Sequence, residues 1–351
     1  MQSLRDFSIK AVSSCIRFPA QLGLGQSNIV EANNFPRSGD IVLLRCTESA
    51  GAYTSIETLS GQNTQLFVGD LFIGVLGDRF SGTNVFGVMP RTPIGVGMRL
   101  DLVAAGGVVA HSVEVPGYCG GKTSSAEVVG FPVTPRGKKL NIDGVGPLAH
   151  SLGSMPRYDC IVVCGTSAEV GKTTMTCSIG RQIKAICAEF RVGAIKACGT
   201  GRIKDIQSYQ KAGFDAAIDY VDFGLVTTYG LPEEKFIQTL EKMTNYVGKQ
   251  TDVLMLEIGG DLYEANAPAA LKYGSELGAQ FILVVNDAMG ATEALRVLGK
   301  ENIMPTCIAS FKQNMHSLKA RLQQNAPFYL DMNRPSDLIE VVSQRILPRL
   351  G

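Results

Sequence analysis

The sequence predicts an α/β fold class in two parts: a mostly β domain, then an α/β domain whose mostly parallel sheet is flanked by helices. The chain has 351 residues, more than one compact core usually contains. Short apolar segments separated by Gly and Asn occupy the first half, and apolar strands alternate with longer helical stretches in the second. We therefore expect an N-terminal segment at 1–35, a mostly β domain at 36–150 and an α/β domain at 153–351.

The composition is that of a globular protein without a strong overall charge. Hydrophobic residues make up 45% of the chain, and its formal net charge is +1. This balance favours buried cores and gives no positive field that would attract nucleic acid. No apolar run has the length of a membrane span or the character of a secretory leader, so we expect a cytoplasmic protein without a membrane partner. The nine cysteines lack the paired spacing of a zinc site, which indicates free thiols.

In the first half, four segments have the apolar pattern of strands, at 40–44, 64–68, 71–76 and 100–104. Glycine-rich stretches at 105–107 and 117–122 are either ordinary turns or points where the backbone approaches a ligand closely. From 134 to 157 the composition shifts to Pro, Gly, Lys and Asn, which is typical of a linker. We expect the domain boundary near residue 153.

In the second half, strands are predicted at 159–164, 192–196, 253–257, 281–286 and 303–310. Helices are predicted from Gly171, near Lys204 and from about Pro335. Because strands and helices alternate, the sheet should be parallel and covered on both faces.

A phosphate-binding loop is predicted where the first of these strands leads into its helix. It consists of Gly165, Thr166, Ser167, Ala168, Glu169, Val170, Gly171, Lys172, Thr173 and Thr174. Backbone N–H groups of such a loop and of the helix N-terminus surround phosphate oxygens. Lys172 would reach the β and γ phosphates and Thr173 would offer its hydroxyl to Mg²⁺, so we expect a nucleotide and Mg²⁺ as cofactors.

The loop is a variant, because the usual first glycine position holds Thr166 and the glycine comes one residue earlier, at Gly165. The form Gly-Thr-x-x-x-Val-Gly-Lys-Thr resembles the loop of dethiobiotin synthetase and its relatives among the P-loop amide ligases and carboxylases. It also resembles that of little-characterised two-domain P-loop proteins related to amino-acid N-acyltransferases. Ser167 replaces the second loop lysine of the dimeric partition and nitrogenase-iron-protein ATPases, which disfavours that subgroup. The resemblance covers about residues 157 to 300.

The same resemblance implies a role for Lys196. Dethiobiotin synthetase carries a lysine in a Lys-Pro-Val-x-x-Gly segment after its second strand, and that lysine contacts substrate and phosphate. Lys196 lies at the matching strand end, although the proline is absent. Ligands of open α/β sheets bind at the carboxyl ends of strands, so Lys196 and Thr200 should face the crevice that contains the loop. The alternative for Lys196 is a solvated surface lysine.

Two acids are candidates for the metal site. Asp205 would help to hold Mg²⁺ or would cap a helix. Glu257 ends an apolar strand and is followed by Gly259 and Gly260, which resembles the Glu-Gly-x-Gly-Gly strand end of the ligases. That resemblance implies metal or water positioning by Glu257 and close backbone approach at the two glycines.

Further substrate and nucleotide contacts are expected around these groups. Asp219 and Asp222, close to Thr228 and Tyr229, would bind an amine or amino-acid substrate, supply a general base, or form a solvated loop. Asn286, at the end of a strand, would lie beside the nucleotide. Since no Asn-Lys-x-Asp guanine signature occurs, the expected nucleotide is ATP.

Three functional hypotheses follow. The first is an ATP- and Mg²⁺-dependent ligase or kinase-like enzyme that phosphorylates a carboxylate or carbamate of a small metabolite, with Lys172, Lys196 and Glu257 as catalytic residues. The second is an acyl-CoA-dependent amino-acid N-acyltransferase. The third is a nucleotide-switched binding or chaperone module. A small-molecule substrate and a homodimer are the expected partners.

Overall fold

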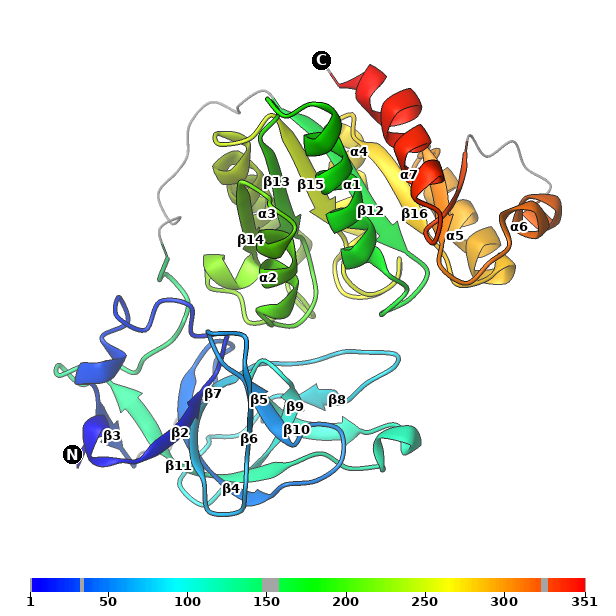
Figure 1. Ribbon diagram of the computed structural model, residues 1–351. Coiled ribbons are helices and arrows are strands. Elements are labelled where there is room, and N and C mark those ends of the chain that lie inside the picture. Colours follow the sequence, from blue (N-terminus) through cyan, green and yellow to red (C-terminus); the bar gives the residue numbers. More distant parts are fainter. Residues whose placement is uncertain (1, 32–34, 147–157, 323–327, 351) are drawn as a thin grey trace. The chain divides into compact units, whose positions relative to one another are not determined.

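The computed structural model describes residues 2–31, 35–146, 158–322 and 328–350 (Figure 1). By its internal contacts the chain divides into two units. The first comprises Met1–His150, Thr200–Lys204 and Tyr220–Gly230, and the second comprises Ser151–Gly199, Asp205–Asp219 and Leu231–Gly351. Two short segments from the second half of the sequence therefore pack with the first unit. The boundary expected near residue 153 lies outside the described residues.

Strands are the main regular elements of the first unit. They are β1 (Gln2–Ser3), β2 (Ile9–Val12), β3 (Asn28–Val30), β4 (Ile41–Glu48), β5 (Ser55–Glu57), β6 (Asn63–Gln65), β7 (Leu71–Leu76), β8 (Phe86–Val88), β9 (Arg99–Ala104), β10 (Val108–Glu114) and β11 (Ser125–Val133). The pairings run β11–β4–β7–β10, and β9 pairs with both β10 and β11. These pairings close a ring, which is the arrangement of a small β-barrel. Its interior is filled by apolar side chains from the ring strands, including Val42, Leu44, Phe72, Leu102 and Val128.

The strand predicted at 64–68 is displaced and shorter than expected. In the structure β6 ends at Gln65 and pairs only with β5, in a separate two-stranded sheet. Phe67 and Val68 are exposed, and the N–H of Phe67 donates a hydrogen bond to Asp70 Oδ2 at 2.9 Å. The apolar residues Phe67 and Val68 therefore lie in a turn and not in a strand. The Asp70 side chain accepts the hydrogen bond that the Phe67 N–H would otherwise donate to a neighbouring strand.

The second unit contains a seven-stranded sheet in the order β14–β13–β15–β12–β16–β17–β18, and every adjacent pair is parallel. The strands are β12 (Asp159–Gly165), β13 (Val192–Lys196), β14 (Ala216–Asp219), β15 (Val253–Glu257), β16 (Gln280–Val284), β17 (Cys307–Ser310) and β18 (Tyr329–Asp331). Strands β12, β13 and β15 are fully apolar in their middle residues, as expected for strands buried on both faces. The predicted fold class is confirmed.

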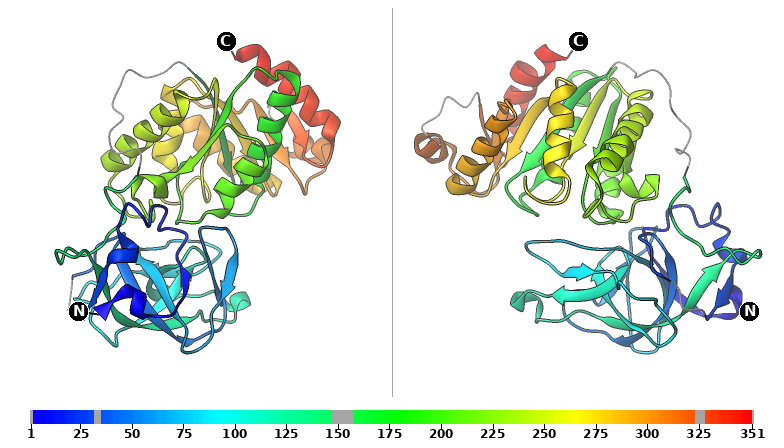
Figure 2. Two further views of the ribbon diagram at one scale, coloured as in Figure 1. Left: turned by 60° about the vertical axis from the view of Figure 1, so that its left-hand side comes forward. Right: turned by 180° about the vertical axis from the view of Figure 1, so that it is seen from behind.

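Helices cover both faces of this sheet. They are α1 (Lys172–Ile186), α2 (Lys204–Lys211), α3 (Glu233–Gly248), α4 (Ala267–Glu276), α5 (Ala288–Lys300), α6 (Met315–Leu322) and α7 (Pro335–Val341). Helices α1 and α7 lie on one face, and α3, α4 and α5 lie on the other (Figures 1 and 2). None of the helices in the described part of the chain has the length and apolar character needed to cross a bilayer.

Candidate functional site: the phosphate loop and its acids

The phosphate loop occupies the connection between β12 and α1, as the sequence predicts. Glu169 and Gly171 both have left-handed backbone conformations, with φ of 61° and 105°. A Cβ atom at Gly171 would lie 2.3 Å from a ring carbon of Phe311, so no other residue fits there without a shift. The loop is therefore shaped by local backbone geometry as well as by packing.

The structure explains why the first glycine is Gly165. This residue ends β12, and a Cβ atom on it would lie 2.7 Å from Val170 Cγ1 and 2.9 Å from the carbonyl oxygen of Val284. Position 166 has no such restriction, and Thr166 Oγ1 accepts a hydrogen bond of 3.4 Å from the backbone N–H of Asn286. The side-chain amide of Asn286 donates to Ser167 Oγ at 2.9 Å. Asn286 thus lies directly against the loop.

Lys172 is buried in the loop, with only 5% of its surface exposed. Its ammonium group donates hydrogen bonds to two carbonyl oxygens, Ser167 O at 2.7 Å and Gly260 O at 2.5 Å. Burial, followed by the positive charge of Lys196, lowers the pKa of Lys172 to about 8, and the negative charge of Glu257 opposes this only in part. The amine is therefore desolvated and held by neutral acceptors.

Glu257 lies at the centre of the site and is completely buried. In the sheet register its neighbours are Val163 on β12 and Lys196 on β13, and Lys196 is in turn paired with Asp219 on β14. The strand ends therefore bring these groups into one row, which is the geometry that places ligand contacts at the carboxyl edge of a parallel sheet.

Four donors surround the carboxylate of Glu257. Oε1 accepts from Thr173 Oγ1 at 2.9 Å and from Lys196 Nζ. Oε2 accepts from Tyr209 Oη at 2.5 Å and, at a longer distance of 3.4 Å, from Thr176 Oγ1. A buried carboxylate needs such partners to replace its lost hydration, and here both oxygens have two.

Lys196 is not a solvated surface lysine, since only 14% of its side chain is exposed. Its ammonium contacts Glu257 and lies 3.3 Å from Asp205 Oδ2. Burial disfavours the charged amine, but the negative charges of Asp205 and Glu257 outweigh burial and raise the pKa of Lys196. Lys196 therefore carries a fixed positive charge beside the loop.

The oxygen atoms available for a metal ion meet at Thr173. Its hydroxyl lies 3.2 Å from Asp205 Oδ1 and 2.9 Å from Glu257 Oε1. Asp205 belongs to the first turn of α2, and its side chain points to Thr173 and Lys196. Within the described ranges, no three or more His, Cys, Asp or Glu side chains form a group that could hold a metal. This donor set still fits Mg²⁺, which takes oxygen ligands and usually one or two carboxylates completed by water and phosphate.

The other predicted residues lie in several places. Gly259 packs tightly against the segment that follows β13, where a Cβ atom would lie 2.1 Å from the carbonyl oxygen of Cys198. Gly260 has a left-handed φ of 69°, and its carbonyl oxygen accepts a hydrogen bond from Lys172. Asp219 is buried at the end of β14. Thr200 and Asp222 belong by their contacts to the first unit, so the second unit does not include them. Substrate binding by these residues stays a prediction.

Two site residues were missed from the sequence, Tyr209 and Thr176. Tyr209 follows Asp205 by four positions, and Thr176 follows Thr173 by three, so each shares a helix face with a predicted residue. Helical spacing was the signal that could have found them. Burial raises the pKa of the Tyr209 hydroxyl well above its ordinary value, with the charge of Glu257 acting in the same direction, so the phenol is a hydrogen-bond donor.

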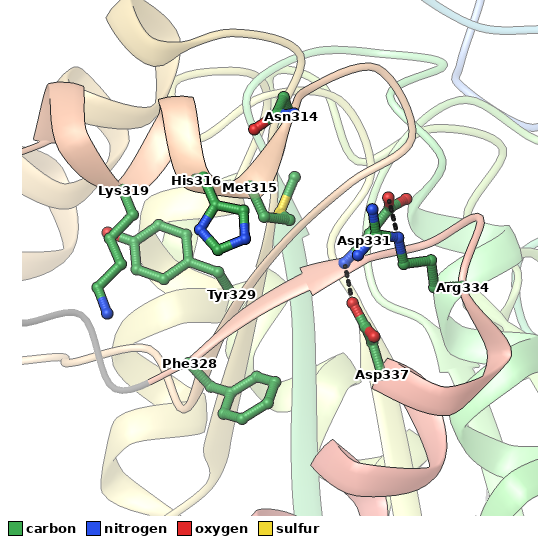
Figure 3. Close-up of a pocket in the computed structure, with 9 residues that line it drawn as sticks. All are labelled: Asn314, Met315, His316, Lys319, Phe328, Tyr329, Asp331, Arg334 and Asp337. Atoms are coloured by element: carbon green, nitrogen blue, oxygen red, sulfur yellow. Dashed lines mark hydrogen bonds and ion pairs between the residues drawn. The ribbon is translucent and has the colours of Figure 1, made fainter.

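A separate pocket of about 310 Å³ lies in the second unit beside α6, β18 and α7 (Figure 3). Phe328 and His316 contribute to its lining, and Asp331 forms an ion pair of 3.3 Å with Arg334. Asp337 Oδ2 accepts a 3.4 Å hydrogen bond from the N–H of Asp331. The acids of this pocket thus stabilise the turn between β18 and α7, and no residue of the phosphate loop lines it.

Comparison with known proteins gives no family. No protein-family model matches the sequence, and no curated protein matches it. Among solved structures, the chain is similar to the signal recognition particle receptor FtsY of Elizabethkingia anophelis, with 17% identity, a TM-score of 0.36, and coverage of 56% of this chain and 67% of that one. The cell division protein FtsY of Thermotoga maritima has 14% identity, a TM-score of 0.35, and coverage of 57% and 73%. The P-loop α/β fold follows from the strand order, register and loop geometry given above.

Proposed function

We propose that the protein is a Mg²⁺-dependent P-loop enzyme that uses ATP to phosphorylate a carboxylate or carbamate of a small metabolite, as ligases and kinases do. The observation that supports it most is the convergence of Lys172, Lys196 and the Thr173 hydroxyl on the buried acid Glu257. Two buried cations beside a phosphate loop suit a reaction that develops negative charge on transferring oxygens.

Each residue has a distinct part in this proposal. The loop N–H groups and the N-terminus of α1 bind the phosphates. Lys172 leaves the carbonyl oxygens of Ser167 and Gly260 and donates to a phosphate oxygen instead. Thr173 and Asp205 would hold Mg²⁺, and Glu257 accepts a hydrogen bond from the Thr173 hydroxyl, so that the lone pairs of the hydroxyl oxygen stay free for the ion. Bound Mg²⁺ supplies further neutralisation of phosphate charge.

The choice of nucleotide and reaction class rests on the sequence. Asn286, two residues after the end of β16, is followed by Asp-Ala-Met, and this segment lacks the Asn-Lys-x-Asp pattern of guanine-binding proteins. The loop and the Glu257 strand end resemble those of dethiobiotin synthetase, which supports a ligase that activates a carboxylate or carbamate. We include a small-molecule substrate, a homodimer and a cytoplasmic location in the proposal.

Calorimetric titration with ATP, GTP and acetyl-CoA, each with and without Mg²⁺, tests the proposal. We expect ATP to bind, Mg²⁺ to strengthen its binding, and GTP and acetyl-CoA to bind more weakly. Tight binding of acetyl-CoA alone would overturn it in favour of an acyltransferase. An ATP affinity that is the same with and without Mg²⁺ would contradict the proposed role of Mg²⁺ at this site.

A further inference from the structure

Helix α2 sends two polar side chains into the site from one face. Asp205 and Tyr209 are four residues apart, which places them on neighbouring turns of the same side. Asp205 reaches Thr173 and Lys196, whereas Tyr209 reaches Glu257. One short helix therefore supplies both an acid beside Thr173 and Lys196 and a hydroxyl donor to Glu257.

Tyr209 is held rigidly. Its side chain is fully buried, and its ring packs against Phe214 with centroids 5.7 Å apart. Its hydroxyl lies 2.5 Å from Glu257 Oε2, whereas the other donor to that oxygen, Thr176, is 3.4 Å away. Tyr209 thus provides the shorter of the two hydrogen bonds to Oε2, whereas Thr173 contacts Oε1.

The orientation of the Glu257 carboxylate decides what Thr173 can do. The last torsion of a glutamate is soft, so hydrogen bonds must set the plane of the carboxylate. A threonine hydroxyl that binds a cation through its oxygen must point its hydrogen at another acceptor. For Thr173 this acceptor is Glu257 Oε1, which receives its hydrogen bond at 2.9 Å. A hydrogen bond that holds Oε2 therefore also fixes the position of Oε1, and Oε1 in turn sets the direction in which the lone pairs of the Thr173 hydroxyl point.

We propose that Tyr209 is a positioning residue that holds the Glu257 carboxylate by its Oε2 atom, so that Oε1 orients the Thr173 hydroxyl toward the metal ion of the bound nucleotide. This inference rests on the proposed function, since it concerns Mg²⁺ at the same site. Tyr209 touches neither nucleotide nor metal and acts only through Glu257.

The test is Tyr209→Phe, which keeps the ring and removes only the hydroxyl. The matched control is Tyr273→Phe, because Tyr273 is also buried in the second unit, and its hydroxyl bonds to Thr244 Oγ1 at 2.7 Å. ATP affinity is measured by calorimetry without metal and across a Mg²⁺ series. We expect Tyr209→Phe to leave metal-free ATP affinity within about twofold of the original protein and to reduce the strengthening by Mg²⁺ about tenfold, the scale of one hydrogen bond to a charged group. The control should leave both unchanged.

The rate of ATP turnover provides a second measurement. In Tyr209→Phe the Mg²⁺ concentration for half-maximal rate should rise and kcat should fall, while KM for ATP at saturating Mg²⁺ stays nearly constant. Equal Mg²⁺ dependence in Tyr209→Phe and the original protein would overturn the inference, as would an equal loss in the Tyr273→Phe control. If the original protein shows no Mg²⁺-dependent ATP binding, the proposed function fails as well.

A second variant tests the same inference if Tyr209→Phe fails to fold. Thr176→Val removes the other, longer hydrogen bond to Glu257 Oε2, together with the 3.0 Å hydrogen bond from the Thr176 hydroxyl to the carbonyl oxygen of Lys172. We expect a loss of Mg²⁺ dependence in the same direction but smaller than for Tyr209→Phe. An unchanged Mg²⁺ dependence in Thr176→Val, with Tyr209→Phe unable to fold, would count against the positioning role.

Discussion

Replacing Lys172 by Met should stabilise the ligand-free protein while it destroys nucleotide binding. The pKa of Lys172 is lowered from 10.5 to about 8, mainly because the amine is buried. Well below pH 8 the ammonium is charged in both the folded and unfolded chain, and the whole pKa shift, from burial and then from the charge of Lys196, corresponds to a free energy of unfolding lowered by about 3 kcal/mol. Met keeps the apolar stem but loses two hydrogen bonds to carbonyl oxygens, which costs about 1–2 kcal/mol. The net expectation at pH 7 is a gain of roughly 1–2 kcal/mol.

The pH dependence gives the sharper test. Between pH 8 and 10.5 the unfolded chain binds a proton that folded Lys172 has released, so the free energy of unfolding of the original protein rises with pH in this window. In urea unfolding without nucleotide, the advantage of Lys172→Met over the original protein at pH 7 should therefore disappear or slightly reverse by pH 10, a change of about 2 kcal/mol. Lys300→Met at an exposed position is the control. A variant that is less stable at pH 7, or a gap that stays constant up to pH 10, would refute the reasoning.

Two further substitutions test the acid and the loop. Glu257→Gln leaves Lys196 without its buried partner and should lower the free energy of unfolding by about 2–3 kcal/mol in urea, while calorimetry shows ATP binding that no longer depends on Mg²⁺. A normal Mg²⁺ dependence would make Glu257 purely structural. Gly171→Ala places a Cβ against the Phe311 ring at a φ of 105°, so we expect a loss of roughly 1–3 kcal/mol and weaker ATP binding. Its control is Gly299→Ala in α5, which meets no atom within 4 Å and should be neutral or slightly stabilising; similar losses in both would contradict the strain argument.

Much of the second unit could be predicted because its strands are buried on both faces. The bounds of β13 and β15 agree with the apolar runs that end at Lys196 and Glu257. The predictions were less accurate where chain geometry rather than polarity ends a strand. Strand β16 stops at Val284, opposite Gly165, because β12 ends there and enters the phosphate loop. Strand β17 starts at Cys307 instead of 303, and Pro305 just before it lacks the N–H that a ladder requires.

The candidate site was predictable only as far as sequence spacing implies position. A strand–loop–helix motif places Lys172 and Thr173, and parallel strand ends bring Lys196 and Glu257 together, because both relations depend on secondary structure alone. The contact of Tyr209 depends on how α2 docks, and a tyrosine in a helix pattern has no feature that separates a core residue from a donor to a buried acid. Yet Glu257 is completely buried, so burial itself demands donors for its second oxygen. A search of the helices beside Glu257 for hydroxyl groups spaced three or four residues from predicted ligands would therefore have found both Thr176 and Tyr209.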